Sequence, residues 1–148
     1  MNNKPRVLLI DDEPDILEVM SMMLTRDGFE VSLAASGEEA LGILTSHVFD
    51  VVVCDFMMPK MDGITMLKQV RANKDYTPYI FFSGNADDSH GTKMVGLGAY
   101  ELLPKTQIKN LSEVIKKTIK HNEGIKNLGH ESSEQSEEFL SLLYSTKT

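Results

Sequence analysis

The sequence predicts an α/β fold, a doubly wound parallel sheet built from five strand–helix units. The first observation behind this prediction is the apolar run 51–54, which is rich in β-branched residues and ends at the carboxylate of Asp55. Because the run does not alternate with polar residues, it suits a strand that helices cover on both faces. The second observation is that strand-like and helix-like patterns follow one another five times with short connections. Such units imply right-handed crossovers and helices on both sides of one sheet.

The first unit begins with the apolar strand 7–10, which leads directly into the acidic residues 11–13. Pro14 stands where the first turn of a helix accepts proline. Apolar residues then recur at helical spacing over 16–24, and Gly28 follows as the residue that ends the helix.

The second and third units follow the same order. The segment 29–33 alternates as a partly exposed strand should. Ser36 and Glu39 form a capping box ahead of an apolar-periodic stretch, in which Glu39 is expected to bond back to the N–H of Ser36. The strand that ends at Asp55 is followed by a tight loop and a helix over about 63–72.

The fourth and fifth units are less regular. A strand is predicted at 79–82, and 84–98 is the weakest helix because three internal glycines each cost about 1 kcal/mol relative to Ala. We expect this segment to move. A short strand at 100–103 precedes a fifth amphipathic helix over 108–121, whose lysines crowd the end that the helix dipole favours.

Composition narrows the functional classes. The 148 residues include 22 acidic and 15 basic side chains, and the net charge of -7 argues against direct binding to nucleic acid or an anionic membrane. The single cysteine, Cys54, lies in the predicted central strand, so we expect no disulfide framework and a cytoplasmic protein. No stretch approaches 18 consecutive apolar residues, and the start does not resemble a signal peptide.

The composition changes at about residue 123, so we place one domain at 4–122 and a tail at 123–148. Within the tail, 131–138 is acidic and polar, as in a flexible linker. A short apolar cluster follows at 139–144. It either packs on its own domain or on nothing, or it serves as a partner-docking helix or the neck of a longer protein.

Polar side chains stand where four predicted strands end: Asp11 and Asp12, Asp55, Ser83, and Lys105. Together with the Met-Pro-Lys-Met-Asp-Gly sequence after Asp55, they resemble the receiver domain of bacterial response regulators over roughly residues 4 to 122. The resemblance implies a flavodoxin-like sheet with strand order 2-1-3-4-5. That order puts the first and third strands side by side, so the three aspartates would converge.

Three crowded carboxylates repel one another, and some must take up protons unless a cation lies among them. Their oxygen ligands suit Mg²⁺ (or Mn²⁺) and not zinc. The resemblance implies that Asp12 and Asp55 bind the ion directly, that the backbone carbonyl of Met57 adds a ligand, and that Asp11 acts through water.

The resemblance also implies that Asp55 is the phosphoryl acceptor, that Lys105 neutralises the phosphoryl oxygens, and that Ser83 donates a hydrogen bond to the product. The donor would be a histidine kinase or a histidine phosphotransfer protein, and the output partner is unknown. Such a protein catalyses only its own phosphorylation and dephosphorylation, with no direct contact to nucleic acid or membrane.

The chain departs from the family pattern around Lys105. Thr106 stands where most receivers have proline, and Pro104 precedes the lysine instead. We expect a trans Lys105–Thr106 bond, because a cis bond before a residue other than proline costs about 2.5–4 kcal/mol. The switch position, usually Tyr or Phe, is Leu102, and Tyr100 on the same strand face is the alternative.

Other functions fit less well. A phosphatase of the haloacid dehalogenase type would need Asp-x-Asp, whereas position 57 is Met. A flavodoxin would bind phosphate in the loop after the first strand, which here is acidic. Two alternatives stay open: a pseudo-receiver that is never phosphorylated and acts as a protein-interaction module, or the N-terminal part of a longer regulator.

Overall fold

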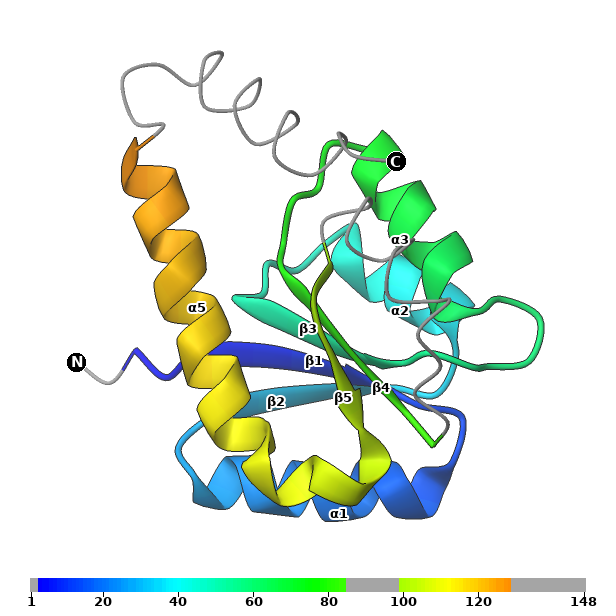
Figure 1. The fold of residues 1–148 in the computed structure, drawn as a ribbon. Coiled ribbons are helices and arrows are strands. Elements are labelled where there is room, and N and C mark those ends of the chain that lie inside the picture. Colours follow the sequence, from blue (N-terminus) through cyan, green and yellow to red (C-terminus); the bar gives the residue numbers. More distant parts are fainter. Residues whose placement is uncertain (1–2, 85–98, 129–148) are drawn as a thin grey trace.

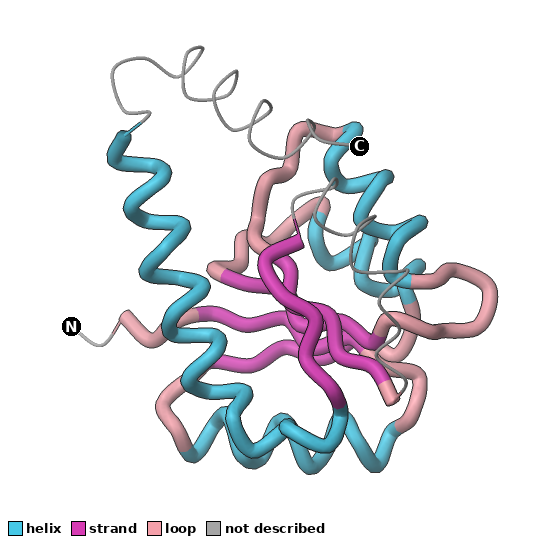
Figure 2. Tube along the Cα trace, viewed as in Figure 1, coloured by secondary structure: helices cyan, strands magenta, loops and turns pink. Residues whose placement is uncertain are grey.

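The computed structural model describes residues 3–84 and 99–128, and these form a five-stranded parallel sheet with helices on both faces (Figure 1). The strand order is β2-β1-β3-β4-β5, which confirms the predicted fold class and topology. Figure 2 shows the strands gathered at the centre and the helices around them. The elements are β1 (Arg6–Ile10), α1 (Pro14–Arg26), β2 (Glu30–Ala34), α2 (Gly37–Leu44), β3 (Val51–Asp55), α3 (Gly63–Ala72), β4 (Tyr79–Ser83), β5 (Ala99–Pro104), a 3-10 helix η1 (Lys105–Asn110) and α5 (Leu111–Leu128).

The core lies on both faces of the sheet. All five residues of β3 are buried, as its unbroken apolar run predicts. On one face, alternate residues of the central strands pack against α2 and α3, and on the other face they pack against α1 and α5. Burying one large aliphatic side chain contributes about 1.5–3 kcal/mol, so these two layers fix the sheet between its helices.

Two helices begin at capping side chains. The Ser36 hydroxyl accepts the N–H of Glu39 at 3.1 Å, as predicted, but the Glu39 carboxylate accepts the N–H of Ala35 and not that of Ser36. Ser36 is extended (φ -157°, ψ 163°), as is usual for a residue that caps a helix. Asp62 caps α3 by accepting the N–H of Thr65 at 2.8 Å. A cap of this kind stabilises a helix by about 1 kcal/mol.

Gly63 fixes the start of α3 against the sheet. A Cβ atom at this position would collide with the ring of Phe81 on β4. Its N–H also donates to the carbonyl of Phe56 at 3.0 Å, which closes the loop between β3 and α3. The loop that follows Asp55 is therefore held at both ends.

The fifth helix differs from its predicted bounds of 108–121. The α-helix starts at Leu111, after the 3-10 segment Lys105–Asn110, within which Gln107 has non-helical backbone angles (φ -107°, ψ 23°). It continues to Leu128, past the change in composition at residue 123, since backbone hydrogen bonding does not require apolar side chains there. The weak helix predicted at 84–98, apart from Gly84, and the tail segments 131–138 and 139–144 lie outside the described residues.

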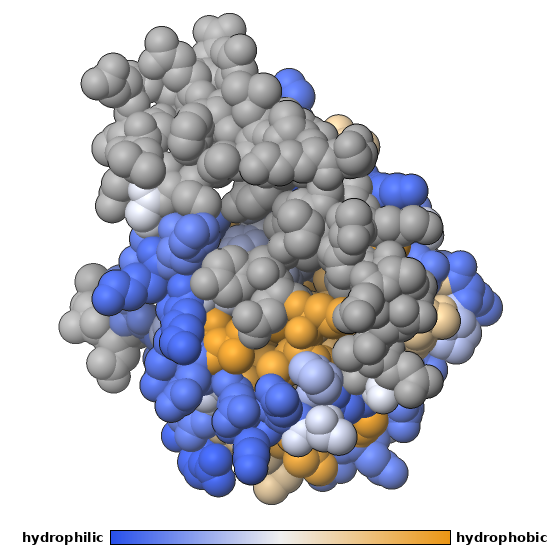
Figure 3. Space-filling view, viewed as in Figure 1, coloured by the Kyte–Doolittle hydropathy of each residue, from blue (hydrophilic) through white to orange (hydrophobic). Residues whose placement is uncertain are grey.

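Figure 3 shows hydrophobic residues gathered over the strands on the face in view, with the hydrophilic residues of α5 along one border. In the described part of the chain, no helix combines the length and the apolar character needed to cross a membrane.

Candidate functional site

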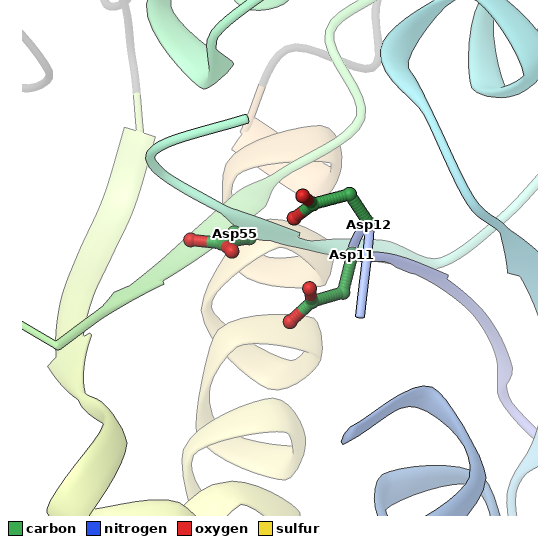
Figure 4. A group of neighbouring side chains, drawn as sticks. All are labelled: Asp11, Asp12 and Asp55. Atoms are coloured by element: carbon green, nitrogen blue, oxygen red, sulfur yellow. The ribbon is translucent and has the colours of Figure 1, made fainter. Parts of the chain in front are cut away.

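The carboxyl ends of β1 and β3 bring three aspartates together. Asp55 is the last residue of β3, and Asp11 and Asp12 follow β1 directly. The two strands are neighbours, with Ile10 opposite Cys54, so their ends meet at one edge of the sheet. One oxygen from each of the three carboxylates lies within 4.8 Å of the others, and Figure 4 shows the side chains side by side.

Asp11 is fully buried, and only one of its two carboxylate oxygens has a hydrogen-bond partner. Its Oδ1 accepts the N–H of Glu13 at 2.8 Å, whereas its Oδ2 is buried and has no hydrogen-bond partner. Burial raises the pKa of Asp11 to about 6; the N–H of Glu13 acts in the opposite direction, and the charge of Asp55 adds to the increase. A buried carboxylate oxygen without a partner is expensive, which marks this position as one that a cation would satisfy.

Asp55 lies in the same environment, with 4% of its surface exposed. Burial raises its pKa, while the N–H of Met57, which donates to Oδ1 at 3.1 Å, and the charge of Lys105 act against the increase. The backbone of the β3–α3 loop thus orients one oxygen of Asp55. Met57 itself is 63% exposed, so it is not part of the core.

Lys105 follows the edge strand β5 and reaches across to the aspartates. Its Nζ lies 3.4 Å from Oδ2 of Asp55, 3.5 Å from Oε1 of Glu13 and 5.5 Å from the centre of the Phe82 ring. Burial lowers the pKa of Lys105, but the carboxylates outweigh this effect, so the pKa is raised and the side chain stays charged. The Lys105–Thr106 bond is trans, as expected, since the described residues contain no cis peptide bond.

The remaining predicted site residues, Ser83, Leu102 and Tyr100, lie on the strands β4 and β5. Ser83 is the last residue of β4 and lies opposite Pro104, next to Lys105, which puts it at the same edge of the sheet. Its side chain lies outside the described part of the structure, as does that of Tyr100. Leu102 is partly buried and packs against the core on the α2 and α3 face. Its role as a switch stays a prediction.

The sequence pattern alone does not reveal two neighbours of Lys105, Glu13 and the Phe82 ring. A third acid directly after Asp11 and Asp12 is the one available signal for Glu13. Phe82 gives no such signal, because an aromatic residue in a buried strand is ordinary core.

Comparison with known proteins decides the family. The model of the response regulator receiver domain matches residues 7–120. The chain belongs to this family. TrcR of Mycobacterium tuberculosis, a transcriptional regulatory protein, is 38% identical over 102 residues, which are 68% of this chain and 39% of TrcR. The response regulator MprA of Mycolicibacterium vanbaalenii is 37% identical over 102 residues, 68% of this chain and 43% of MprA. The chain thus matches about two fifths of the length of these curated relatives.

Solved receiver domains have the same fold. The receiver domain of the Francisella response regulator 1452 is 29% identical, with a TM-score of 0.76 over 80% of this chain and 99% of that one. TrrA of Thermotoga maritima, solved in complex with Mg²⁺ and BeF, is 30% identical, with a TM-score of 0.69 over 77% of this chain and 98% of TrrA. Among the residues that the structure describes, the acidic cluster of this receiver offers donors that suit such an ion: three carboxylates, one of them with an unpartnered buried oxygen, and no His or Cys.

Proposed function

We propose that this receiver accepts a phosphoryl group on Asp55 and thereby switches the binding of a partner protein. The arrangement of Asp55 is the observation that carries the proposal. Its carboxylate is nearly buried between an acidic cluster and a lysine, with Oδ1 held by a backbone N–H and Oδ2 facing Lys105. A carboxylate that is fixed and shielded from bulk water is suited to act as a nucleophile toward phosphorus.

The metal ligands that we propose are Asp11, Asp12, Asp55 and the backbone carbonyl of Met57, with Asp12 and Asp55 in direct contact and Asp11 acting through water. A bound Mg²⁺, or Mn²⁺ in its place, would neutralise part of the charge on Asp55 and on the incoming phosphoryl group. The unpartnered Oδ2 of Asp11 supports this set, because its desolvated charge needs a cation or a proton.

In the reaction, an oxygen of Asp55 forms a bond to phosphorus in line with the bond to the donor, which breaks as the donor leaves. Lys105 is within reach of the new phosphoryl oxygens, and its raised pKa keeps it protonated for this role. Ser83, at the end of β4, would donate its hydroxyl to the same group, and Gly84 leaves room for it to enter. Leu102, or Tyr100 in its place, would change its side-chain rotamer on phosphorylation and so alter the surface near β5.

The donor is proposed to be a histidine kinase or a histidine phosphotransfer protein in the cytoplasm. The output partner is proposed to be another protein, since the net charge of -7 disfavours direct contact with nucleic acid or an anionic membrane. The receiver would catalyse only its own phosphorylation and dephosphorylation. We assign 4–122 to the receiver and 123–148 to a tail whose first residues continue α5.

The test is incubation of the whole chain with acetyl phosphate and Mg²⁺, followed by intact-protein mass spectrometry. The wild type should gain one phosphoryl group, and Asp55→Asn should gain none. Asp50→Asn is the matched control, because Asp50 precedes the same strand at its opposite end and should leave labelling unchanged. A wild type that takes up no phosphoryl group would instead favour the pseudo-receiver, and labelling of Asp55→Asn at another residue would refute the acceptor.

A further inference from the structure

Glu13 contacts two residues of the site, Asp11 through its backbone and Lys105 through its side chain. Its backbone N–H donates to Oδ1 of Asp11 at 2.8 Å, and its carboxylate Oε1 lies 3.5 Å from Nζ of Lys105. The same Nζ lies 3.4 Å from Oδ2 of Asp55. One ammonium group therefore lies at similar distances from the proposed acceptor, to which it donates a hydrogen bond, and from a second, more exposed carboxylate.

The contact between Glu13 and Lys105 is not a by-product of helix capping. Glu13 is the N-cap of α1, yet its side chain makes no capping hydrogen bond. Preferred cap residues are Ser, Thr, Asp and Asn, whose short side chains reach the N–H groups of the first turn. The Glu13 carboxylate extends toward Lys105 and leaves those N–H groups without it, so its interaction is with the site and not with its own helix.

Phosphorylation changes what Lys105 must bind. A phosphoryl group on Asp55 adds negatively charged oxygens beside Oδ2, and an ammonium group is drawn to them as a point charge. If Lys105 moves toward these oxygens, its contact with Glu13 lengthens and weakens. The Lys105–Glu13 pair would then stabilise the unphosphorylated state relative to the phosphorylated one.

We propose that Glu13 competes with the phosphoryl group for Lys105 and so sets how strongly this receiver holds its phosphorylated state. This inference rests on the proposed acceptance of a phosphoryl group by Asp55. Glu13 acts through Lys105 and is a positioning residue, not a catalytic one. Its side chain is 59% exposed, so solvent screens the pair, and the effect should be about two- to fivefold in affinity.

The test measures binding of beryllofluoride, a phosphoryl stand-in, to the whole chain at saturating Mg²⁺ by NMR titration. Glu13→Gln removes the competing charge and keeps the shape and the backbone N–H, so it should bind beryllofluoride about two- to fivefold more tightly than the wild type. Glu18→Gln is the matched control, since it removes the same charge from an exposed position on the same helix and should change little. The rate of phosphorylation by acetyl phosphate, followed by mass spectrometry, should rise in parallel.

A double-mutant cycle shows whether the effect passes through Lys105. In a Lys105→Met background, Glu13→Gln should give no gain, because the contested ammonium is gone. Equal gains with and without Lys105 would mean simple repulsion of the anion and would overturn the proposal, as would unchanged or weaker binding by Glu13→Gln alone. If the wild type neither binds beryllofluoride nor becomes phosphorylated, the proposed function itself fails; if the wild type does both, only the competition is at stake.

Discussion

The Nζ atom of Lys105 lies 3.4 Å from Oδ2 of Asp55, across fifty residues of sequence. Lys105 follows the edge strand β5 and Asp55 ends the central strand β3, with β4 between them. The two side chains are 25% and 5% exposed, so the pair is shielded from solvent mainly on the Asp55 side. The charge state of the acidic cluster therefore depends on a residue from the far edge of the sheet.

Removing the lysine should raise the pKa of Asp55 further. Lys105 opposes the increase that burial causes, so Lys105→Met leaves desolvation less compensated. Carboxyl carbon chemical shifts followed by NMR during a pH titration without Mg²⁺ would measure the change. Lys109→Met, at an exposed position of the same 3-10 segment, should leave the Asp55 titration where it is. An unchanged Asp55 pKa in Lys105→Met would show that the pair is not formed in solution.

Without metal, the folded state should lose stability as the pH rises through the pKa of Asp11. Burial raises the pKa of Asp11 from 3.8 to about 6, so the folded state holds this proton more tightly than the unfolded state. The contribution is therefore fully present below about pH 4 and is lost as the pH rises to about 6. Allowing for solvent screening, we expect roughly 1–2 kcal/mol at neutral pH.

The variant Asp11→Asn checks this, because it removes the ionisation. Without Mg²⁺, its free energy of unfolding in urea should exceed that of the wild type by roughly 1–2 kcal/mol at pH 7.5 and match it near pH 4. Asp12→Asn is the control, since Asp12 is exposed and should give a smaller difference. A gain for Asp11→Asn that does not vary with pH would exclude the proton as its cause.

The two acids after β1 should differ in metal binding. Loss of a group that acts on a metal through water typically weakens affinity about 10–100-fold, and loss of a direct ligand weakens it more. In isothermal titration with Mg²⁺, Asp12→Ala should therefore bind more weakly than Asp11→Ala. Asp15→Ala, in the exposed first turn of α1, should bind as the wild type does. Equal losses would mean that Asp11 and Asp12 act on the ion in the same way, and a larger loss for Asp11→Ala would mean that their roles are reversed.

Gly63 should tolerate no side chain. Gly63→Ala drives a methyl group into the Phe81 ring, and overpacking of this kind costs about 1–3 kcal/mol. Thermal unfolding followed by circular dichroism would measure it. Gly42→Ala is the control on α2, where a Cβ meets nothing within 4 Å, so helix propensity should stabilise that variant by about 0.5–1 kcal/mol. A neutral Gly63→Ala would mean that Phe81 moves aside without loss.

The sequence by itself determined the fold class and the acidic residues of this receiver, and its resemblance to receiver domains supplied the strand order. An unbroken apolar run indicates a strand that is covered on both faces, and β3 is buried at every position, as its run predicts. The alternating run of β2 was less informative, because that strand is partly exposed without a matching alternation and Leu33 is among its exposed residues. Asp11 and Asp55 could be placed at one edge of the sheet because parallel strands end there, and because Asp11 directly follows its strand and Asp55 ends its own. That these two strands are neighbours was implied by the resemblance. Backbone position alone decides such contacts.

Only the tertiary structure decided where the long and flexible side chains go. Glu39 accepts the N–H of Ala35, and Glu13 contacts Lys105 without capping α1, although local capping rules favour nearer partners. The 3-10 segment Lys105–Asn110, with its kink at Gln107, likewise precedes α5 although no periodicity reveals it. A periodic pattern records which face of an element is buried. The partner of a charged group depends on which opposite charge the fold brings within reach, and for Lys105 that was settled by three strands meeting at one edge of the sheet.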